Sequence, residues 1–196
     1  MNNHYREFYE SLIGDASRAG VYLMPQRHHD DLETAAGHAG CCTFHVDLAR
    51  ARNKDEMLDQ IGRALAFPEW FGHNWDALAD CLLDMGWRPA LGFVVMLKNA
   101  EFIHSRAESD FACLLKIFAD VATERRGEGV PFWCLVDIPA NKLSELKSRM
   151  MTSGFASSCR HIAAPVSAKM QSMPAVASVE LSTWRVPGSS STISAV

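Results

Sequence analysis

The chain has 196 residues, of which 48% are hydrophobic and 21% are charged, and its formal net charge is −4. These values are ordinary for a soluble globular protein. The length suits either one domain with a sizeable core or one domain with extensions. The longest wholly apolar run covers only a few residues near Phe93–Leu97, which excludes a transmembrane helix. The N-terminal sequence MNNHYREFYE has neither a basic segment nor an apolar core, so we expect no secretory signal.

The charge is distributed unevenly along the chain. The first 138 residues contain 21 acidic and 13 basic side chains, and the remainder contains two acidic and six basic ones. The first part therefore carries a net charge of −8 and the second +4. Affinity for phosphate backbones comes from basic groups, so nucleic acid is disfavoured as the direct ligand. An acidic globular part suits a basic protein partner instead.

The cysteines show neither a C-x-x-C pair nor the spacing of a zinc knuckle; they are Cys41, Cys42, Cys81, Cys113, Cys134 and Cys159. Without a secretory signal, the default is reduced thiols in the cytoplasm. Cys81 and Cys134 lie in apolar segments, and we predict that both are small core residues.

Residues 1–40 are predicted to form an extension before the main unit. Apolar side chains over residues 5–12 have helical spacing, and residues 20–24 form a short strand that Pro25 stops. A second helix then ends near Gly40. The extension is expected to add a βα unit to the edge of the sheet that follows.

The run His28-His29-Asp30-Asp31 stands at the start of this second helix. Asp30 or Asp31 suits the N-cap position, because a carboxylate oxygen accepts hydrogen bonds from free backbone N–H groups. The run also contains residue types that bind metals, but four consecutive positions cannot all face one ion. A capping turn therefore explains the run better than a metal site does.

Residues 42–48 alternate between apolar and polar side chains, which predicts a strand with His45 on its surface side. Asn53 followed by Glu56 has the spacing of a capping box. Apolar residues at helical spacing then predict a helix that ends near Ala66.

Residues 67–73 form an aromatic loop broken by one proline and one glycine, and Asn74 suits the N-cap of a helix that closes at Gly86. Of the adjacent loop aromatics Trp70 and Phe71, we expect Phe71 to be the buried one. One face of the helix is apolar and should meet the core; it carries Trp75, Leu78, Leu82 and Met85.

The opposite face of this helix carries a stripe of acids, Asp76, Asp80 and Asp84. Like charges four residues apart repel by roughly 0.2–0.5 kcal/mol per pair, and no basic residue on the helix relieves them. Only Asp76, in the first turn, is favoured by the helix dipole. Local stability given up in this way indicates a functional surface, although a solvated polar face is the simpler alternative.

The next segments alternate between buried strands and a helix. Residues 93–97 form a continuous apolar run typical of a strand covered on both faces, and residues 130–136 form another. Between them a helix, ended by a basic turn at residues 125–129, places five apolar side chains inward: Phe111, Leu114, Leu115, Phe118 and Val121. Strands alternating with helices predict a parallel α/β layer.

The composition changes after Pro139, since residues 141–196 contain 13 serines and few aromatics. We expect a helix over residues 142–151 and then a loosely ordered tail with at most one short strand near residues 176–181. The predicted division of the chain is an N-terminal extension (1–40), a main domain (41–138) and a C-terminal tail (139–196).

The stretch FPEWFGHNWDALADCL resembles the corresponding loop and helix of barstar, the intracellular protein inhibitor of barnase-type ribonucleases. The matching positions are Trp70, Phe71, Gly72, Asn74, Asp76, Ala77, Leu78, Asp80 and Cys81. The order of elements from about Cys41 to Asp137 also fits. The resemblance implies a three-layered α/β fold with a small parallel sheet flanked by helices. The N-terminal βα extension and a poorly ordered C-terminal tail are additions to that fold.

In barstar this loop and helix plug the ribonuclease active site, and the aspartate that matches Asp80 takes the place of the substrate phosphate. The resemblance implies that the partner-binding residues here are Trp70, Phe71, Gly72, His73, Asn74, Asp76, Ala79, Asp80 and Asp120. Barstar has a glutamate at the position of His73 and a tryptophan at that of Ala79. A different ribonuclease, or weaker binding of the same one, is therefore expected.

Three functions are open: a ribonuclease inhibitor, a barstar-fold module with another protein target, and a metal-dependent enzyme. His73, Asp76 and Asp80 could form a metal or acid–base cluster. However, no G-x-S-x-G, P-loop or H-E-x-x-H motif supplies the other parts of an active site. We therefore expect a cytoplasmic protein that is not an enzyme, needs no cofactor or metal and contacts no membrane. Its expected partner is a basic extracellular-type or toxin ribonuclease, and the free protein is expected to be a monomer.

Overall fold

The structure is a computed structural model that describes residues 9–24, 29–137, 183–185 and 192–195. Its strands form one sheet in the order β2-β3-β4-β1-β6-β5. The strands are β1 (Val21–Met24), β2 (Cys41–Asp47), β3 (Gly92–Lys98), β4 (Phe132–Asp137), β5 (Thr183–Arg185) and β6 (Thr192–Ala195). The helices are the 3₁₀ helix η1 (Ala16–Arg18), α2 (His29–His38), α3 (Lys54–Ala64), α4 (Trp75–Asp84), α5 (Ala100–Arg106) and α6 (Glu108–Gly127). Residues 9–13 are also helical.

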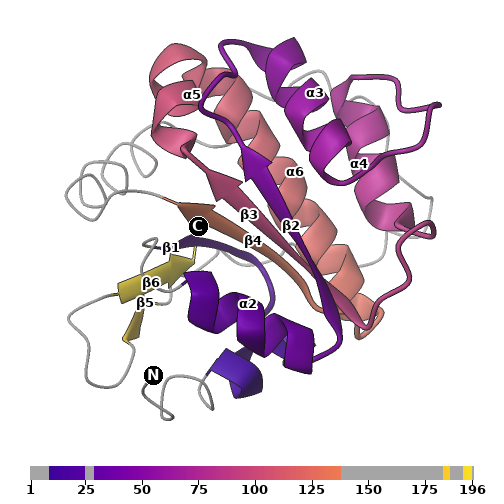
Figure 1. Cartoon of the computed structure of the whole chain (residues 1–196), viewed down its shortest axis with the longest axis vertical. Helices are drawn as coiled ribbons and strands as arrows, with labels where there is room; N and C mark the ends of the chain where they lie inside the picture. Colours follow the sequence, from indigo (N-terminus) through magenta and orange to yellow (C-terminus); the bar gives the residue numbers. More distant parts are fainter. Residues whose placement is uncertain (1–8, 25–28, 138–182, 186–191, 196) are drawn as a thin grey trace, which may run out of the picture.

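Four strands, β2, β3, β4 and β1, pair in parallel and form the centre of the fold (Figure 1). Alternate side chains of β3 face opposite layers. Phe93, Val95 and Leu97 join one hydrophobic cluster, and Val94 and Met96 join the other. All five are buried, which confirms the predicted strand covered on both faces. The fold is therefore a three-layered α/β structure, as predicted.

Helices α3, α4, α5 and α6 lie on one face of the sheet, and α2 lies on the other (Figure 1). The chain crosses the sheet in one direction from β2 through β3 to β4, and in the opposite direction from β1 to β2. Because crossovers between parallel strands are right-handed, reversing the direction moves the connecting helix to the other face. This rule explains why α2 covers the face that the later helices leave open.

The N-terminal extension buries the second face of the sheet. Its strand, β1, pairs in parallel with β4, as expected for a βα unit added at the sheet edge. Tyr9, Ile13 and Leu32 are buried in one cluster with Trp133 of β4. The indole Nε1–H of Trp133 donates a 3.1 Å hydrogen bond to the backbone oxygen of Ile13. The extension therefore covers apolar sheet surface that would otherwise meet solvent.

One local expectation about the helices is wrong, and one helix was not expected. α2 already includes His29, so Asp30 and Asp31 lie in its first turn, where the helix dipole favours them, and neither is its N-cap. The helix that was not expected is α5, which follows β3 directly. The turn into α5 uses Asn99 in a left-handed conformation (φ 57°), and its side chain donates to Asp47 Oδ1 at 2.7 Å instead of capping the helix. Asn is one of the residue types that adopt this conformation most readily, but one Asn is too weak a signal to predict α5.

The C-terminal segment contributes two strands where the sequence predicts at most one. β6 pairs antiparallel with β1, and β5 pairs antiparallel with β6. The outer edge of β1 presents unpaired backbone N–H and C=O groups, which a further strand can satisfy. The helix predicted at residues 142–151 and the strand predicted at residues 176–181 fall outside the described residues.

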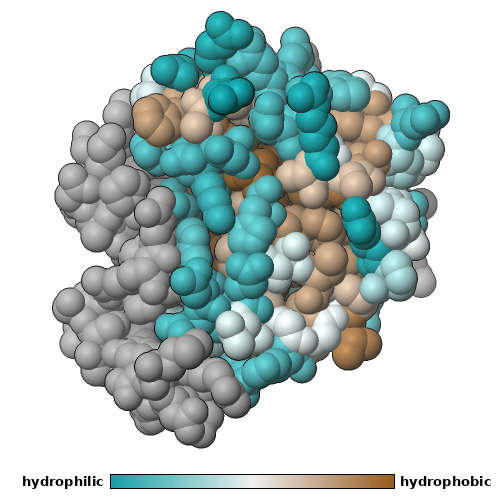
Figure 2. Space-filling view, in the orientation of Figure 1, coloured by the Kyte–Doolittle hydropathy of each residue, from teal (hydrophilic) through white to brown (hydrophobic). Residues whose placement is uncertain are grey.

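Hydrophilic residues line the top edge of the molecule, and hydrophobic patches lie beside α5 and in the middle of the view (Figure 2). Among the residues that the structure describes, three large hydrophobic side chains are exposed: Trp70, Leu91 and Phe102. Single exposed apolar residues are normal on protein surfaces. Trp70 differs from the other two because it lies in the predicted binding loop.

Candidate functional site

Two backbone hydrogen bonds at the end of α3 fix the direction in which the loop before α4 leaves that helix. The backbone N–H of Ala66 donates to Arg63 O at 3.2 Å, and that of Phe67 donates to Gly62 O at 2.8 Å. These two bonds form a Schellman motif, in which Ala66 takes the left-handed conformation (φ 51°) that glycine usually occupies. A side chain at such a position costs roughly 1–2 kcal/mol, so the surrounding contacts must hold the turn.

A row of aromatic rings holds this loop. The Phe71 ring lies 4.9 Å from that of Phe67, Phe67 lies 5.8 Å from Trp87, and Trp87 lies 6.2 Å from Trp70. All three pairs meet edge to face, and such pairs contribute about 0.5–1.5 kcal/mol beyond their buried area. At the other end of the row, the imidazole of His73 lies 4.6 Å from the Phe71 ring. The row ties the loop to the segment that follows α4.

The two neighbouring loop aromatics have different environments. Phe71 is 6% exposed and Trp70 is 58% exposed, which confirms Phe71 as the buried member of the pair. A Cβ atom on Gly62 of α3 would lie 3.1 Å from two ring carbons of Phe71. The ring therefore packs directly on the helix backbone at Gly62, while Trp70 presents flat apolar surface to solvent.

The last turn of the loop positions the start of α4. His73 has a left-handed backbone (φ 49°), and its Nδ1–H donates to Phe71 O at 3.0 Å. The Asn74 side chain accepts from Ala77 N at 2.9 Å, which confirms the predicted N-cap, and donates to Gly72 O at 3.3 Å. A Cβ on Gly72 would lie 3.0 Å from Asn74 Nδ2 and crowd this cap. Glycine at position 72 therefore leaves room for the capping side chain.

The apolar face of α4 is buried as predicted at Leu78, Leu82 and Met85. Trp75, which the sequence places on the same face, is only partly buried, and Lys54 Nζ lies 5.2 Å from its ring centroid. The helix ends at Asp84 and not at Gly86, because Met85 takes the left-handed conformation (φ 46°) and closes it. Cys81 and Cys134 are both buried, as expected.

The acidic stripe on α4 faces solvent. Asp76, Asp80 and Asp84 are all exposed, and no ion pair joins any of them to another residue that the structure describes. The negative charges of Asp80 and Asp84 also act on the core beneath the helix. Burial first, and then the charges of Asp80 and Asp84, raise the pKa of the Cys81 thiol to about 11. The stripe is therefore a set of available carboxylates on a rigid helix.

Arg125 of α6 anchors α4 from inside the molecule. Its side chain is buried, and Nη2 donates to the backbone oxygen of Leu82 at 3.1 Å. The guanidinium also lies 5.2 Å from the centre of the Phe93 ring. Burial lowers the pKa of Arg125, and the charges of Glu128 and Asp84 oppose that shift. Arg125 of α6 is therefore the cation that partly offsets the negative charge of Asp84, at the C-terminal end of the stripe. In the sequence, Arg125 is only part of a basic turn.

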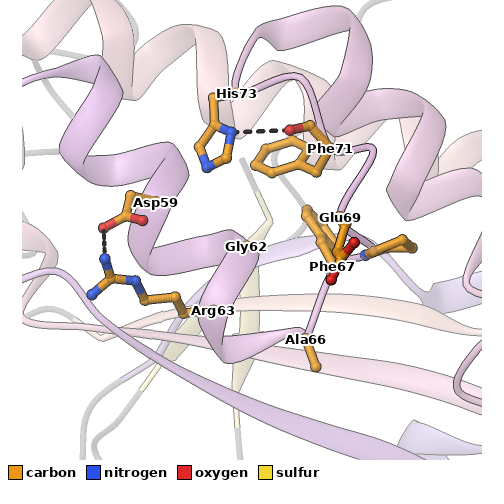
Figure 3. A pocket seen from close by; sticks show the side chains of 9 residues that line it. Asp59, Gly62, Arg63, Ala66, Phe67, Glu69, Phe71 and His73 are labelled. Carbon is orange, nitrogen blue, oxygen red and sulfur yellow. Dashed lines mark hydrogen bonds and ion pairs between the residues drawn. The ribbon is translucent and has the colours of Figure 1, made fainter.

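A pocket of about 270 Å³ lies between α3 and the loop (Figure 3). On the α3 side it is lined by Asp59, Gly62 and Arg63. The loop contributes Ala66, Phe67, Pro68, Glu69, Phe71 and His73. Within α3, Arg63 Nη2 and Asp59 Oδ2 form an ion pair at 2.9 Å. This pocket could not be predicted from the sequence, since nothing in the pattern of α3 shows which side of the helix the loop covers.

Comparisons with known proteins place these elements in one family. The family model described as Barstar (barnase inhibitor) matches residues 42–137. A protein of Bacillus subtilis (strain 168), named "Putative ribonuclease inhibitor YrdF", is 31% identical over 83 residues, which make up 42% of this chain and 88% of that protein. The chain belongs to the barstar family. The matched range contains the whole loop, α4 and α6, and therefore every residue of the candidate site.

Two of the positions that the barstar likeness implies, Ala79 and Asp120, are not exposed acids without an ion-pair partner. Ala79 is half-buried on α4. Asp120 is exposed on α6, but its carboxylate lies 2.6 Å from Lys116 Nζ one turn earlier in the same helix. The charge of Asp120 is therefore partly compensated, unlike the charges of Asp76 and Asp80. The binding role of all these residues stays a prediction.

The alternative metal or acid–base cluster gains no geometric support from this barstar-family fold. His73 lines the pocket beside α3, and neither Asp76 nor Asp80 lines that pocket. Across the described ranges, no group of three or more His, Cys, Asp or Glu side chains is arranged to hold a metal ion. None of the helices in those ranges is both long enough and apolar enough to cross a membrane.

Proposed function

We propose that this chain inhibits a basic ribonuclease by placing the loop and helix at residues 67–84 in the enzyme's active site. The observation that carries the proposal is the exposure of Asp76 and Asp80 on a folded helix, with no ion pair to any described residue. Membership of the barstar family, and the name of the Bacillus relative, support the same function.

The physical basis is substitution of protein carboxylates for substrate phosphates. A ribonuclease active site gathers cationic side chains to bind phosphate, and the same side chains form short, charge-assisted hydrogen bonds with carboxylates. Asp80 would occupy the phosphate position and Asp76 would lie one turn away. Trp70 would add flat apolar area, since exposed aromatics are frequent anchors of interfaces. The fixed loop and capped helix reduce the entropy lost on binding.

The chain would act as a blocking partner and carry out no reaction of its own. We propose that it works in the cytoplasm as a monomer, without a cofactor or a metal, and that it binds its partner protein without contacting nucleic acid or membrane. The partner would be basic, as in an extracellular-type or toxin ribonuclease, because the first 138 residues carry a net charge of −8.

The test is a pull-down from the source cell followed by a ribonuclease assay on any small basic enzyme recovered. Asp80→Ala is expected to weaken inhibition by at least about 2 kcal/mol, the general threshold for interface hot spots, of which barstar is itself a standard example. Folding stability should change little, because the Asp80 side chain is exposed and makes no ion pair with a described residue.

Asp30→Ala provides the control, since Asp30 is an exposed acid on α2, across the sheet from α4. This variant should inhibit as well as the unchanged protein. Equal inhibition by the Asp80→Ala variant would remove the proposed site. Recovery of a different kind of protein would favour a barstar-fold module with another target.

A further inference from the structure

The pocket between α3 and the loop has an aromatic wall and a small volume. The rings of Phe67 and Phe71 line it at a centroid distance of 4.9 Å, and the His73 imidazole lies 4.6 Å from Phe71 (Figure 3). Its volume of about 270 Å³ is below the range of roughly 300–1,000 Å³ that small-molecule sites occupy. A protruding side chain of a partner protein suits such a pocket better than a free ligand does.

The charged groups around the pocket favour a cation. Asp59 and Glu69 are acidic, and Arg63 is the single basic residue among the lining side chains apart from His73. Arg63 pairs with Asp59 and is otherwise largely exposed, with 73% of its side chain accessible. Glu69 is exposed and forms no ion pair with any described residue. One carboxylate at the pocket is therefore uncompensated.

His73 adds a hydrogen-bond acceptor to the pocket. Because its Nδ1 faces the carbonyl oxygen of Phe71, that nitrogen carries the proton. In the neutral imidazole the other nitrogen, Nε2, then has a free lone pair. An acceptor beside an unpaired carboxylate suits a side chain with several N–H donors.

We propose that this pocket receives an arginine side chain of the protein partner, with the guanidinium paired to Glu69 and packed against Phe67. Arginine fits because its planar group stacks on aromatic faces, pairs with carboxylates and is weakly hydrated. The inference rests on the proposed function, which supplies a basic protein as the partner. It adds a second contact to that interface, since neither Asp76 nor Asp80 lines the pocket.

The test uses the isolated full chain and a small probe, N-acetyl-arginine methylamide, followed by backbone amide NMR. Saturable shifts are expected in the millimolar range at Gly62, Phe67, Phe71 and His73. The neutral citrulline analogue, which has nearly the same shape, should give none, and the capped lysine should bind more weakly. Shifts confined to α4, equal shifts with citrulline, or tighter binding of lysine would each overturn the proposal.

Two variants separate a direct contact from a structural effect. Glu69→Gln should weaken binding of the arginine probe by roughly two- to fivefold, the range of an exposed ion pair. Arg63→Gln should strengthen it by a similar factor, because it frees Asp59 from its present partner. Glu124→Gln, the same change at an exposed position of α6, should leave the affinity unchanged. If the Arg63→Gln variant binds the arginine probe no better than the unchanged protein, Arg63 does not compete with the probe for Asp59.

The result of the arginine-probe experiment is independent of ribonuclease inhibition. A protein that inhibits a ribonuclease but does not bind the arginine probe at the pocket overturns this inference and leaves the proposed function intact. A protein that binds the probe at the pocket but inhibits no ribonuclease overturns the proposed function and leaves the pocket as an arginine site.

Discussion

At the residue scale, Asn53 and Asn74 make the same contact at the starts of α3 and α4. Each side-chain oxygen accepts from the backbone N–H three residues later, at 3.0 Å from Glu56 and 2.9 Å from Ala77. Both caps were predictable, because a capping contact lies within four consecutive residues. The capping box at Asn53 is modified, since the Glu56 carboxylate accepts from the backbone N–H of Arg52 and not from that of Asn53.

This pair allows stability to be separated from binding. Asn53→Ala and Asn74→Ala should each lower the free energy of unfolding by about 1 kcal/mol, measured by urea denaturation. Only Asn74→Ala should also weaken ribonuclease inhibition, because its cap orients the helix that carries Asp76 and Asp80. Equal inhibition by the two variants would show that the Asn74 cap contributes to folding alone.

At the element scale, the contact between α3 and the loop depends on a missing side chain. Gly62→Ala should weaken inhibition, since a Cβ at 3.1 Å from the Phe71 ring forces the loop to move. Its effect on stability should be small, because the gain in helix propensity, about 1 kcal/mol, offsets the clash.

Gly37→Ala is the matched control in α2, where an added Cβ meets nothing within 4 Å. It should raise the free energy of unfolding by about 0.5–1 kcal/mol and leave inhibition unchanged. Unaltered inhibition by the Gly62→Ala variant would mean that the loop position does not depend on the Phe71–Gly62 contact.

The adjacent arginines at the end of α6 hold different elements. Arg125 donates to Leu82 O of α4, whereas Arg126 donates to Ala19 O, beyond η1, at 2.6 Å. Arg125→Met should leave the buried Leu82 carbonyl without its donor at a cost of about 1–3 kcal/mol, speed hydrogen exchange in α4 and weaken inhibition. Arg126→Met should leave exchange in α4 unchanged. Faster exchange in α4 for both variants, or for neither, would argue against a specific anchor at Arg125.

At the scale of the whole molecule, acid stability is expected to depend on His29, which α2 buries near β4. Burial lowers the pKa of His29 below its ordinary value of 6.5, while the nearby Asp137 carboxylate opposes the shift and Lys98 adds to it. The folded protein therefore keeps His29 neutral at pH values where the unfolded chain takes up a proton. Stability should fall as the pH drops below about 6.5, until it reaches the folded pKa, and should be constant above that window.

Urea denaturation between about pH 7.5 and 5.5 measures this effect, and His29→Gln should flatten the profile. Carboxyl groups titrate in a separate window. Hydrogen bonds hold the pKa values of Asp15, Asp47 and Glu56 below their ordinary values, so their contribution to stability is lost only as the pH falls below about 4. If the stability of the unchanged protein does not vary between about pH 7.5 and 5.5, His29 does not have this role.

Burial of both sheet faces was partly predictable. The continuous apolar run of β3 indicates a strand with neighbours on both sides, but it does not say which segment covers each side. The structure assigns the second face to α2 and to residues 9–13, which the sequence analysis treated as an extension before the main unit. The division of the chain at residues 40 and 138 stays a prediction.

The sequence by itself determined the features whose causes are local. These are the caps at Asn53 and Asn74, the alternation of β2, the apolar face of α4 and the acidic stripe opposite it, because each depends on residues at most a few turns apart. Only the tertiary structure decided that Phe71 packs on Gly62, that Arg125 anchors α4 from α6, and that a pocket forms beside Glu69. Arg125 and Leu82 lie 43 residues apart, and the other contacts join α3 to a loop with no regular repeat, so all of them follow from how the elements pack and not from a periodic pattern.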